Sequence, residues 1–297
     1  MALTNREAFF KAKELISKSE TKVSDSEIYE LLIFANDYSS YSDIVMNFES
    51  TLKNEEQFFA NLNRVISGEP IQYVLNVAPF LDFDFYVDKR VLIPRPETEG
   101  LVLLVKNFIV DNKIRHKTIA DLCTGSGCIA IYMKAYFEDS NVYATDIHGE
   151  CLDVAKMNAK KFKADINFLK GNMSEPLFDI DERIDILISN PPYAPNDNEI
   201  EEKVKKYEPI DAIVTEGGVT FYEDYFKNYK KFMSSDKFLM AFEINYDEED
   251  KLTELINKYF DNSQISFKFF KDIYNLTRYL IIMKGYKKDV LEEVRDW

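Results

Sequence analysis

Residues 190–193, Asn-Pro-Pro-Tyr, end an isoleucine-rich apolar run and have side chains that could hold a planar amide or amine. The prolines have no N–H group to give to a sheet, so the run is predicted to be a buried strand that stops there. Asn190 then lies at the carboxyl end of a strand, where open α/β sheets bind ligands. Its side-chain oxygen and the Pro191 carbonyl are acceptors for an NH2 group, held in a stiff frame by Pro192. The Tyr193 ring offers a flat surface to the attached group. The alternative is a purely structural role, in which these residues form a strand end followed by an ordinary proline-containing turn.

A second candidate site is the turn at 123–127, Cys-Thr-Gly-Ser-Gly, between a predicted strand at 119–122 and a predicted helix at 128–137. Its glycines allow the backbone to approach a ligand closely. The next predicted strand, 141–145, ends in Asp146, where a carboxylate can accept both ribose hydroxyls of a nucleoside. Each such charged hydrogen bond contributes about 1.5–3 kcal/mol. The combination indicates an adenosine-type cofactor.

The class of cofactor follows from patterns that the sequence lacks. Neither a G-x-G-x-x-G pyrophosphate pattern nor a Walker lysine is present, which disfavours a phosphate-bearing nucleotide. S-adenosylmethionine carries no phosphate and fits these constraints. His116 and His148 lie outside any motif, and His148 is predicted to be a surface residue at a helix start. Because Cys123 and Cys128 have no partners at ligand spacing, no metal site is expected.

Composition limits the class of protein further. The 297 residues are 46% hydrophobic, which is enough apolar material for a folded core in one or two domains. Asp and Glu number 52 against 37 Lys and Arg, and the net charge of -15 disfavours nucleic acid as the main partner. The sequence shows no signal-peptide pattern, no apolar run of membrane-spanning length and no disulfide framework. We therefore expect a cytoplasmic protein, and the acidic surface is compatible with a monomer.

The first 76 residues are predicted to form a small helical bundle. Ser24 and Glu27 have capping-box spacing, and apolar residues follow them at helical intervals. A second amphipathic run, 58–66, ends at Gly68. No catalytic constellation is found in this part, so a role in substrate recognition would belong to its surface.

Residues 77–93 have an aromatic, β-prone pattern and are predicted to form a hairpin that joins two domains. A turn at 88–90 would precede a strand at 91–93. The segment 94–99, Pro-Arg-Pro-Glu-Thr-Glu, follows, and a helix is expected from Gly100 onward. Acidic residues suit the start of a helix, but this does not explain why two prolines frame the arginine.

From residue 118 onward, strands and helices alternate, which predicts a mainly parallel sheet with helices on both faces. Strands at 238–243, 265–270 and 279–283 would complete seven. The predicted fold class is α/β, a seven-stranded Rossmann-like domain with a small N-terminal helical bundle joined by a β-hairpin. The predicted domains are 1–76, the hairpin linker 77–93, and 94–297.

Several blocks of the sequence match one known family in order. They are 68–73, 92–99, 121–127, 189–193, Glu208-Pro209 with Ala212 and Gly217-Gly218, and Lys271-Asp272 with Arg278. On these blocks nearly the whole chain resembles the release factor glutamine methyltransferases, the HemK/PrmC family. The resemblance implies a class I S-adenosylmethionine-dependent methyltransferase domain at 94–297. It also implies methyl transfer to the glutamine of the GGQ motif in class I peptide-chain release factors.

The resemblance implies roles for single residues as well. The cofactor-binding positions are Thr98, Asp121, Thr124, Gly125, Gly127, Asp146, Asn172 and Asn190. The catalytic and substrate-binding positions are Asn190, Pro191, Pro192 and Tyr193. Two positions depart from the family pattern, because Cys123 stands where a glycine is usual and Asn172 where an aspartate commonly contacts adenine. Both departures concern cofactor affinity rather than the chemistry.

Two other functions remain open from the sequence. An adenine-amino methyltransferase acting on DNA or RNA shares the Asn-Pro-Pro-Tyr block, but an acidic chain without a basic region fits nucleic acid poorly. A cofactor-binding adaptor without activity is compatible with the two departures, but the intact block at 190–193 argues against it. Whether Tyr207 and Glu208 contact substrate or shape the loop is also open.

Overall fold

The computed structural model describes residues 2–115, 117–196, 198 and 200–287, and the chain divides into two compact units. One unit is made of residues 1–77 together with 202–207, and the other of 78–201 together with 208–297. The first unit is therefore built from two separate stretches of chain. Among the described residues, no helix is both long enough and apolar enough to cross a membrane.

The first unit is helical. Its helices are α1 (Asn5–Ile16), α2 (Asp25–Asn36), α3 (Tyr41–Met46), α4 (Glu55–Ile66), α5 (Ile71–Leu75) and α9 (Glu202–Tyr207). The capping box predicted at Ser24 and Glu27 is confirmed at the start of α2. The Tyr207 hydroxyl donates to the Ser67 carbonyl at 3.0 Å, which ties α9 to the end of α4. The assignment of residues 1–76 as a substrate-recognition domain stays a prediction.

The second unit contains a seven-stranded sheet in the order β5-β4-β3-β6-β7-β9-β8. The strands are β3 (Thr118–Leu122), β4 (Asn141–Asp146), β5 (Asn167–Lys170), β6 (Ile186–Ser189), β7 (Phe238–Glu243), β8 (Ile265–Lys271) and β9 (Thr277–Lys284). Strands β3 to β7 are parallel, and β9 is antiparallel to both β7 and β8. The predicted α/β fold class is confirmed.

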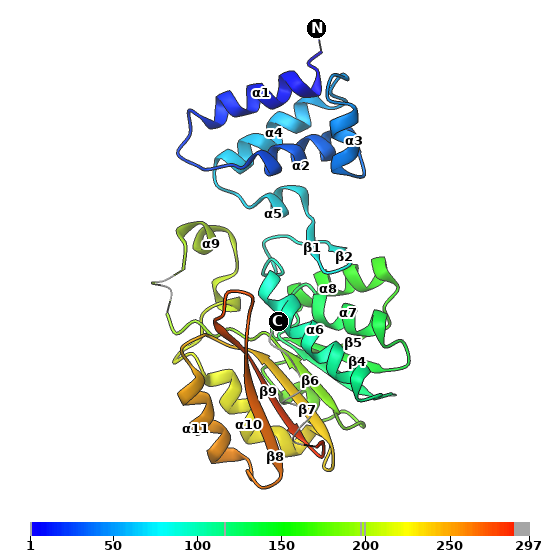
Figure 1. Ribbon diagram of the computed structural model, residues 1–297, viewed down its shortest axis with the longest axis vertical. Coiled ribbons are helices and arrows are strands. Elements are labelled where there is room, and N and C mark those ends of the chain that lie inside the picture. The colour runs from blue at the N-terminus through cyan, green and yellow to red at the C-terminus, as the bar shows by residue number, and fades with distance from the viewer. Residues whose placement is uncertain (1, 116, 197, 199, 288–297) are drawn as a thin grey trace. The chain divides into compact units, whose positions relative to one another are not determined.

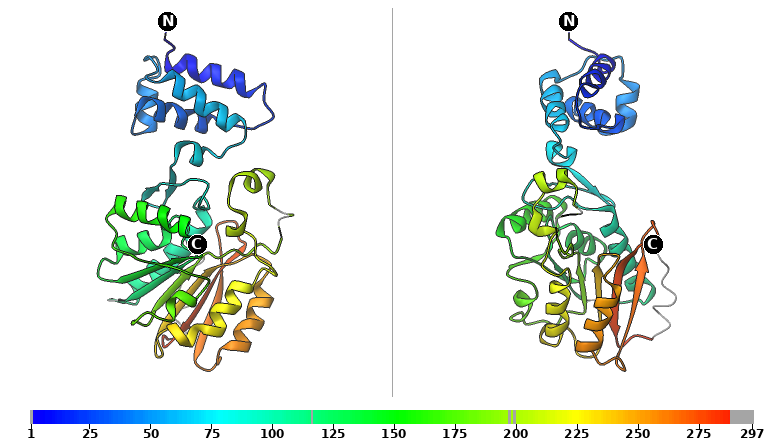
Figure 2. Two further views of the ribbon diagram at one scale, coloured as in Figure 1. Left: turned by 180° about the vertical axis from the view of Figure 1, so that it is seen from behind. Right: turned by 90° about the vertical axis from the view of Figure 1, so that its left-hand side faces the viewer.

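Helices cover both faces of this sheet (Figure 1), which Figure 2 shows from two further sides. They are α6 (Pro96–Asp111), α7 (Cys128–Tyr136), α8 (Gly149–Phe162), α10 (Thr220–Phe232) and α11 (Glu249–Tyr259). Phe108 of α6 and Ile186 of β6 share one core cluster, whereas Tyr222 of α10 and Leu187 of β6 share another. Strand β6 is therefore buried on both sides, as expected for the centre of a parallel sheet.

The register of the parallel strands brings their carboxyl ends to one edge of the sheet. Leu122 of β3 lies opposite Thr145 of β4 and Ser189 of β6, and Ser189 lies opposite Phe242 of β7. The strand order reverses at β3, because β4 lies on one side of it and β6 on the other. Residues that follow β3, β4 and β6 therefore meet at the switch point where such sheets bind ligands.

The hairpin differs from its prediction. Strands β1 (Ala78–Phe80) and β2 (Phe83–Phe85) pair antiparallel, and the chain reverses at 81–82 rather than at 88–90. Residues 88–90 do contain a turn, but 91–93 form no strand. The reason is that the Ile93 amide donates to the Glu208 carboxylate at 3.1 Å instead of to a strand.

The helix expected from Gly100 begins earlier, at Pro96. A proline is tolerated in the first turn because its missing N–H would have no partner there. Glu97 and Glu99 then lie in the first turn, where the helix dipole favours negative charge. Thr98 is buried in the same turn, which gives it a fixed position at the carboxyl edge of the sheet.

Candidate active site

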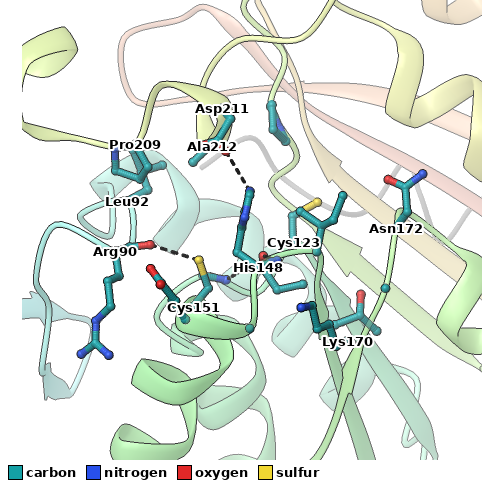
Figure 3. Close-up of a pocket in the computed structure, with 18 of the residues that line it drawn as sticks. Arg90, Leu92, Cys123, His148, Cys151, Lys170, Asn172, Pro209, Asp211 and Ala212 are labelled. Atoms are coloured by element: carbon teal, nitrogen blue, oxygen red, sulfur yellow. Dashed lines mark hydrogen bonds and ion pairs between the residues drawn. The ribbon is translucent and has the colours of Figure 1, made fainter.

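A cavity of about 500 Å³ opens at the carboxyl edge of the sheet (Figure 3), within the size range of small-molecule sites. The predicted site residues that line it are Gly125, Asp146, Asn172, Asn190 and Pro192. Six other predicted site residues do not line the cavity within the described part of the chain: Thr98, Asp121, Thr124, Gly127, Pro191 and Tyr193. Asp121 of the second group lies near the end of β3, and Thr124 and Gly127 belong to the turn that follows it, beside the lining residue Gly125.

Asp121 and Thr124 fix the turn that follows β3. Asp121 is fully buried, and its Oδ2 accepts hydrogen bonds from the Thr124 hydroxyl at 2.5 Å and from the Ala130 amide at 3.2 Å. Burial raises the pKa of Asp121 to about 7, although both hydrogen bonds oppose the rise. The Thr124 amide donates to the Thr145 carbonyl at 2.9 Å, which joins the turn to β4. These two residues therefore shape the cavity from behind.

The same turn requires a left-handed backbone at several positions. Cys123, Gly125 and Gly127 have φ angles of 61°, 53° and 83°. A Cβ atom at Gly127 would lie 3.1 Å from the Ala155 Cβ, so glycine allows α7 to begin close against α8. Cys123 adopts a conformation that glycine adopts more easily, which gives a physical reason for the glycine that the resemblance implies at this position. Its Sγ lies 3.6 Å from the Tyr225 hydroxyl.

Asp146 ends β4, and backbone amides hold its carboxylate in place. Oδ2 accepts from the Gly125 amide at 3.0 Å, and Oδ1 accepts from the His148 amide at 2.9 Å. The residue is only 9% exposed, and burial raises the pKa of its carboxyl against the effect of these bonds. Each carboxylate oxygen can accept a further hydrogen bond, so the group can still receive two hydroxyls from the cavity.

A contact between a histidine and an aspartate at the cavity was not predicted from the sequence. His148 Nε2 lies 2.8 Å from Asp211 Oδ2, and Figure 3 shows the two side chains pointing toward each other. His148 precedes α8, whereas Asp211 belongs to the 3-10 turn η2 (Ile210–Ala212). The sequence placed His148 only at a helix start, because nothing in the spacing links it to Asp211.

The Asn190 side chain belongs to a chain of hydrogen bonds that also contains Thr98, Glu243 and Tyr193. Asn190 Nδ2 donates to the Thr98 hydroxyl at 2.9 Å, and that hydroxyl donates to Glu243 Oε2 at 2.7 Å. The Tyr193 hydroxyl donates to Glu243 Oε1 at 2.9 Å. Four side chains from α6, β7 and the loop after β6 are thereby brought together at one strand end.

Glu243, the centre of this chain, was missed by sequence reasoning. It is 1% exposed, and burial raises the pKa of its carboxyl against the lowering effect of the Thr98 and Tyr193 hydrogen bonds. A signal was available, because Glu243 is an acidic residue at the end of a strongly apolar predicted strand, like Asp146.

Arg95 and Glu208 pair with each other, which explains the arginine between two prolines. Arg95 Nη2 lies 2.7 Å from Glu208 Oε1, and the Ile93 amide donates to Oε2 of the same carboxylate. The Glu208 side chain is only 3% exposed. Glu208 therefore joins the loop after the Asn-Pro-Pro-Tyr block to the segment before α6, while Tyr207 belongs to the first unit.

The seven-stranded sheet and the cavity at its carboxyl edge define a class I methyltransferase of the Rossmann-like kind. Residues 98–234 match the methyltransferase small domain family. The chain is 30% identical to the release factor glutamine methyltransferase of Clostridium acetobutylicum over 94% of this chain and 98% of that protein. It is 35% identical to the Staphylococcus aureus protein of the same name over 70% of this chain and 74% of that one.

A solved structure, the release-factor-specific protein-(glutamine-N5) methyltransferase of Alicyclobacillus acidocaldarius, is also similar. It is 19% identical, with a TM-score of 0.44, over 68% of this chain and 100% of that chain. The sequence relatives are the stronger finding because two of them are at least 30% identical over more than two thirds of both chains. The chain belongs to the release factor glutamine methyltransferase family.

Proposed function

We propose that the protein transfers a methyl group from S-adenosylmethionine to the side-chain amide nitrogen of the GGQ glutamine in class I peptide-chain release factors. The observation that carries the proposal is the placement of Asn190 at the same cavity as Asp146. One residue is suited to a planar NH2 group and the other to a ribose. Family membership supports the same substrate.

The residues at the cavity fit the cofactor. Asp146 has free acceptor capacity for the ribose hydroxyls, and an added Cβ at Gly125 would meet no heavy atom within 4 Å, which leaves room for a ligand. Asn172 follows β5 beside Lys170 and can accept the adenine amino group through its amide oxygen. When bound, S-adenosylmethionine supplies an electrophilic methyl group on a sulfonium. Asp121, Thr124 and Gly127 would keep the turn in shape from behind.

Asn190 and Pro191 would orient the substrate amide. The nitrogen of an amide is a poor nucleophile because its lone pair is delocalised into the carbonyl. Hydrogen bonds from the two N–H groups to the Asn190 side-chain oxygen and the Pro191 carbonyl would fix the position of the nitrogen. Good orientation of two reactants lowers the activation barrier by about 7–11 kcal/mol in favourable cases. The substrate nitrogen would lose one proton to solvent, so no strong base is required. Pro192 and Tyr193 would complete the surface against the planar amide.

The remaining parts of the proposal concern the partner and the setting. We propose that the surface of residues 1–76 recognises the release factor, while 94–297 carries the chemistry. The protein would act as a monomer in the cytoplasm, where release factors work. No contact with nucleic acid is required, which agrees with the net charge of -15.

The test is transfer of labelled methyl from S-adenosylmethionine to a purified class I release factor. Parallel reactions contain its GGQ-to-GGA variant and adenine-containing DNA and RNA. Label on the wild-type factor alone supports both the substrate and the acceptor residue. Label on nucleic acid would favour an adenine-amino methyltransferase instead, and cofactor binding without any transfer would favour a non-catalytic adaptor.

A further inference from the structure

The hydrogen-bond chain at Asn190 has a direction that is set at its buried end. Glu243 receives hydroxyl hydrogens on both carboxylate oxygens, from Thr98 at 2.7 Å and from Tyr193 at 2.9 Å. Two hydroxyl donors favour the ionised form of a carboxyl, because a carboxylate accepts at both oxygens whereas a protonated carboxyl has to donate at one of them. Burial raises the pKa of Glu243, whereas the two hydroxyl donors and the positive charge of Arg278 on the adjacent strand β9 favour the ionised form.

An ionised Glu243 leaves Thr98 with only one possible arrangement. A hydroxyl has a single hydrogen, and Thr98 gives it to Glu243. The Thr98 oxygen can therefore only accept from its other partner, the Asn190 side chain. Among the atoms of the Asn190 amide only Nδ2 can donate, which agrees with the 2.9 Å bond from Nδ2 to Thr98.

Fixing Nδ2 of Asn190 also fixes Oδ1. Because the two atoms lie on opposite branches of a planar amide, Oδ1 is directed away from Thr98. Among the described residues Oδ1 has no hydrogen-bond partner, while Asn190 lines the cavity. The free atom of Asn190 is thus an acceptor, which is what a substrate NH2 group requires.

We propose that Glu243 is a positioning residue that makes Asn190 present its oxygen, and not its NH2 group, to the acceptor nitrogen of the substrate. The inference rests on the proposed function for the identity of that acceptor, an amide NH2. It assigns Glu243 no contact with substrate or cofactor. Its effect is transmitted through the Thr98 hydroxyl, and Tyr193 holds the other carboxylate oxygen.

A neutral isostere shows what the charge contributes. In Glu243→Gln the new amide can donate its NH2 to the Thr98 oxygen and accept from Tyr193. Thr98 is then free to donate its hydrogen to Asn190 Oδ1. The Asn190 side-chain amide would rotate by about half a turn to accept this hydrogen bond, and its NH2 group would then face the substrate NH2 group. Two donors facing each other cannot form a hydrogen bond.

The closing experiment measures turnover on a release factor for Glu243→Gln, Thr98→Val and Thr98→Ser. We expect kcat to fall by roughly 100-fold in Glu243→Gln and in Thr98→Val, which lacks the hydroxyl but keeps the shape, with little change in cofactor Kd. Thr98→Ser restores the hydroxyl and is expected to restore most of kcat. Glu254→Gln, an exposed position on α11, is the matched charge control.

Coupling to Asn190 separates orientation from general damage. If Glu243 acts through Asn190, the double variant Glu243→Gln with Asn190→Ala should be no slower than Asn190→Ala alone. Near wild-type kcat in folded Glu243→Gln, or additive losses in the double variant, would overturn the inference. Should Glu243→Gln fail to fold, the contrast between Thr98→Val and Thr98→Ser decides, because equal turnover in these two variants excludes a relay through the hydroxyl.

A readout without substrate distinguishes this inference from the proposed function. In the wild-type protein, NMR should show the Asn190 side-chain NH2 hydrogens close to Thr98 and slow to exchange, and both signs should be lost in Glu243→Gln. If wild-type protein methylates no release factor, the proposed function fails although this NMR result can still hold. If Glu243→Gln keeps the Asn190 NH2 against Thr98, the orientation inference fails whatever the enzyme methylates.

Discussion

The two strand ends at the cavity hold their key side chains in different ways. At the end of β4, Asp146 is held by backbone amides 21 and 2 residues away, those of Gly125 and His148. At the end of β6, Asn190 is held by Thr98, 92 residues away, and Thr98 is held by Glu243, 145 residues away. One arrangement is local and made by the backbone, whereas the other is long-range and made by side chains.

The difference matters because backbone donors are present whatever the side chains are. A substitution in the turn after β3 leaves the amides that hold Asp146 in place as long as the turn keeps its shape. At Asn190, by contrast, we expect one change of hydrogen-bonding type at Thr98 or Glu243 to reverse every hydrogen bond between Glu243 and Asn190. We therefore expect the cofactor side to tolerate substitution better than the side that binds the acceptor.

The largest effect is expected for Asn190→Ala. Removing the acceptor should lower kcat by roughly 100-fold or more, because the substrate nitrogen is no longer oriented. Cofactor binding should change little, since Asp146 is held by other groups. Asn196→Ala, at an exposed position in the same loop, is the control in the methyl-transfer assay. Unchanged turnover in Asn190→Ala would show that Asn190 does not orient the substrate nitrogen, and the two strand ends could then not be compared in this way.

Asp146→Ala should act on binding instead. Loss of charged hydrogen bonds worth about 1.5–3 kcal/mol each should weaken cofactor affinity by at least roughly 10-fold. Calorimetric titration with the cofactor measures this directly, with the exposed Asp153→Ala of α8 as the control. Turnover should recover at high cofactor concentration, and an unaltered Kd would show that Asp146 does not hold the ribose.

Arg95→Met tests the long-range clamp on the acceptor side. Among the described residues it leaves the nearly buried Glu208 carboxylate with the Ile93 amide as its remaining partner, which should lower the free energy of unfolding by about 1–3 kcal/mol. Arg6→Met breaks the exposed pair with Glu49, and such pairs contribute about 0–1 kcal/mol. Denaturant unfolding of both variants gives the comparison, and equal losses would mean that the Arg95 pair is no more than a surface contact.

A pH-dependent prediction concerns Glu248, a buried carboxyl beyond β7 without a hydrogen-bond partner among the described residues. Burial raises its pKa from 4.5 to about 7, against the effect of Lys251. Between these values the folded state binds more protons than the unfolded state, so this group makes the free energy of unfolding fall as pH rises through that window.

Glu248→Gln should remove this contribution. Thermal unfolding at pH 5 and pH 8 should show a smaller drop in Tm for the variant than for the wild-type protein, while Glu254→Gln keeps the wild-type drop. Parallel pH profiles for wild type and Glu248→Gln would show that Glu248 has an ordinary pKa. The result would contrast this carboxyl, which lacks a hydrogen-bond donor among the described residues and has only Lys251 at 3.8 Å, with Glu243, which has two hydroxyl donors.

The sequence alone determined six of the seven strands, all except β5, together with the turn after β3 and the placement of Asp146 and Asn190 at strand ends. These features depend on local patterns, such as apolar runs, prolines and glycines, that are readable within a few residues. The hairpin turn was misplaced because Glu208, far along the chain, takes the Ile93 amide. The start of α6 was placed late because the first turn contains prolines that also fit a loop.

Only the tertiary structure decided which side chains support the site. Four pairs show this, and their members are separated by tens to more than a hundred residues of sequence: Asn190 with Thr98, Thr98 with Glu243, Arg95 with Glu208, and His148 with Asp211. Such pairs form because the parallel register brings distant strand ends to one edge, and no local spacing encodes them. The sequence specified the atoms that can face a ligand, and the packing of the sheet specified which of their hydrogen bonds remain free.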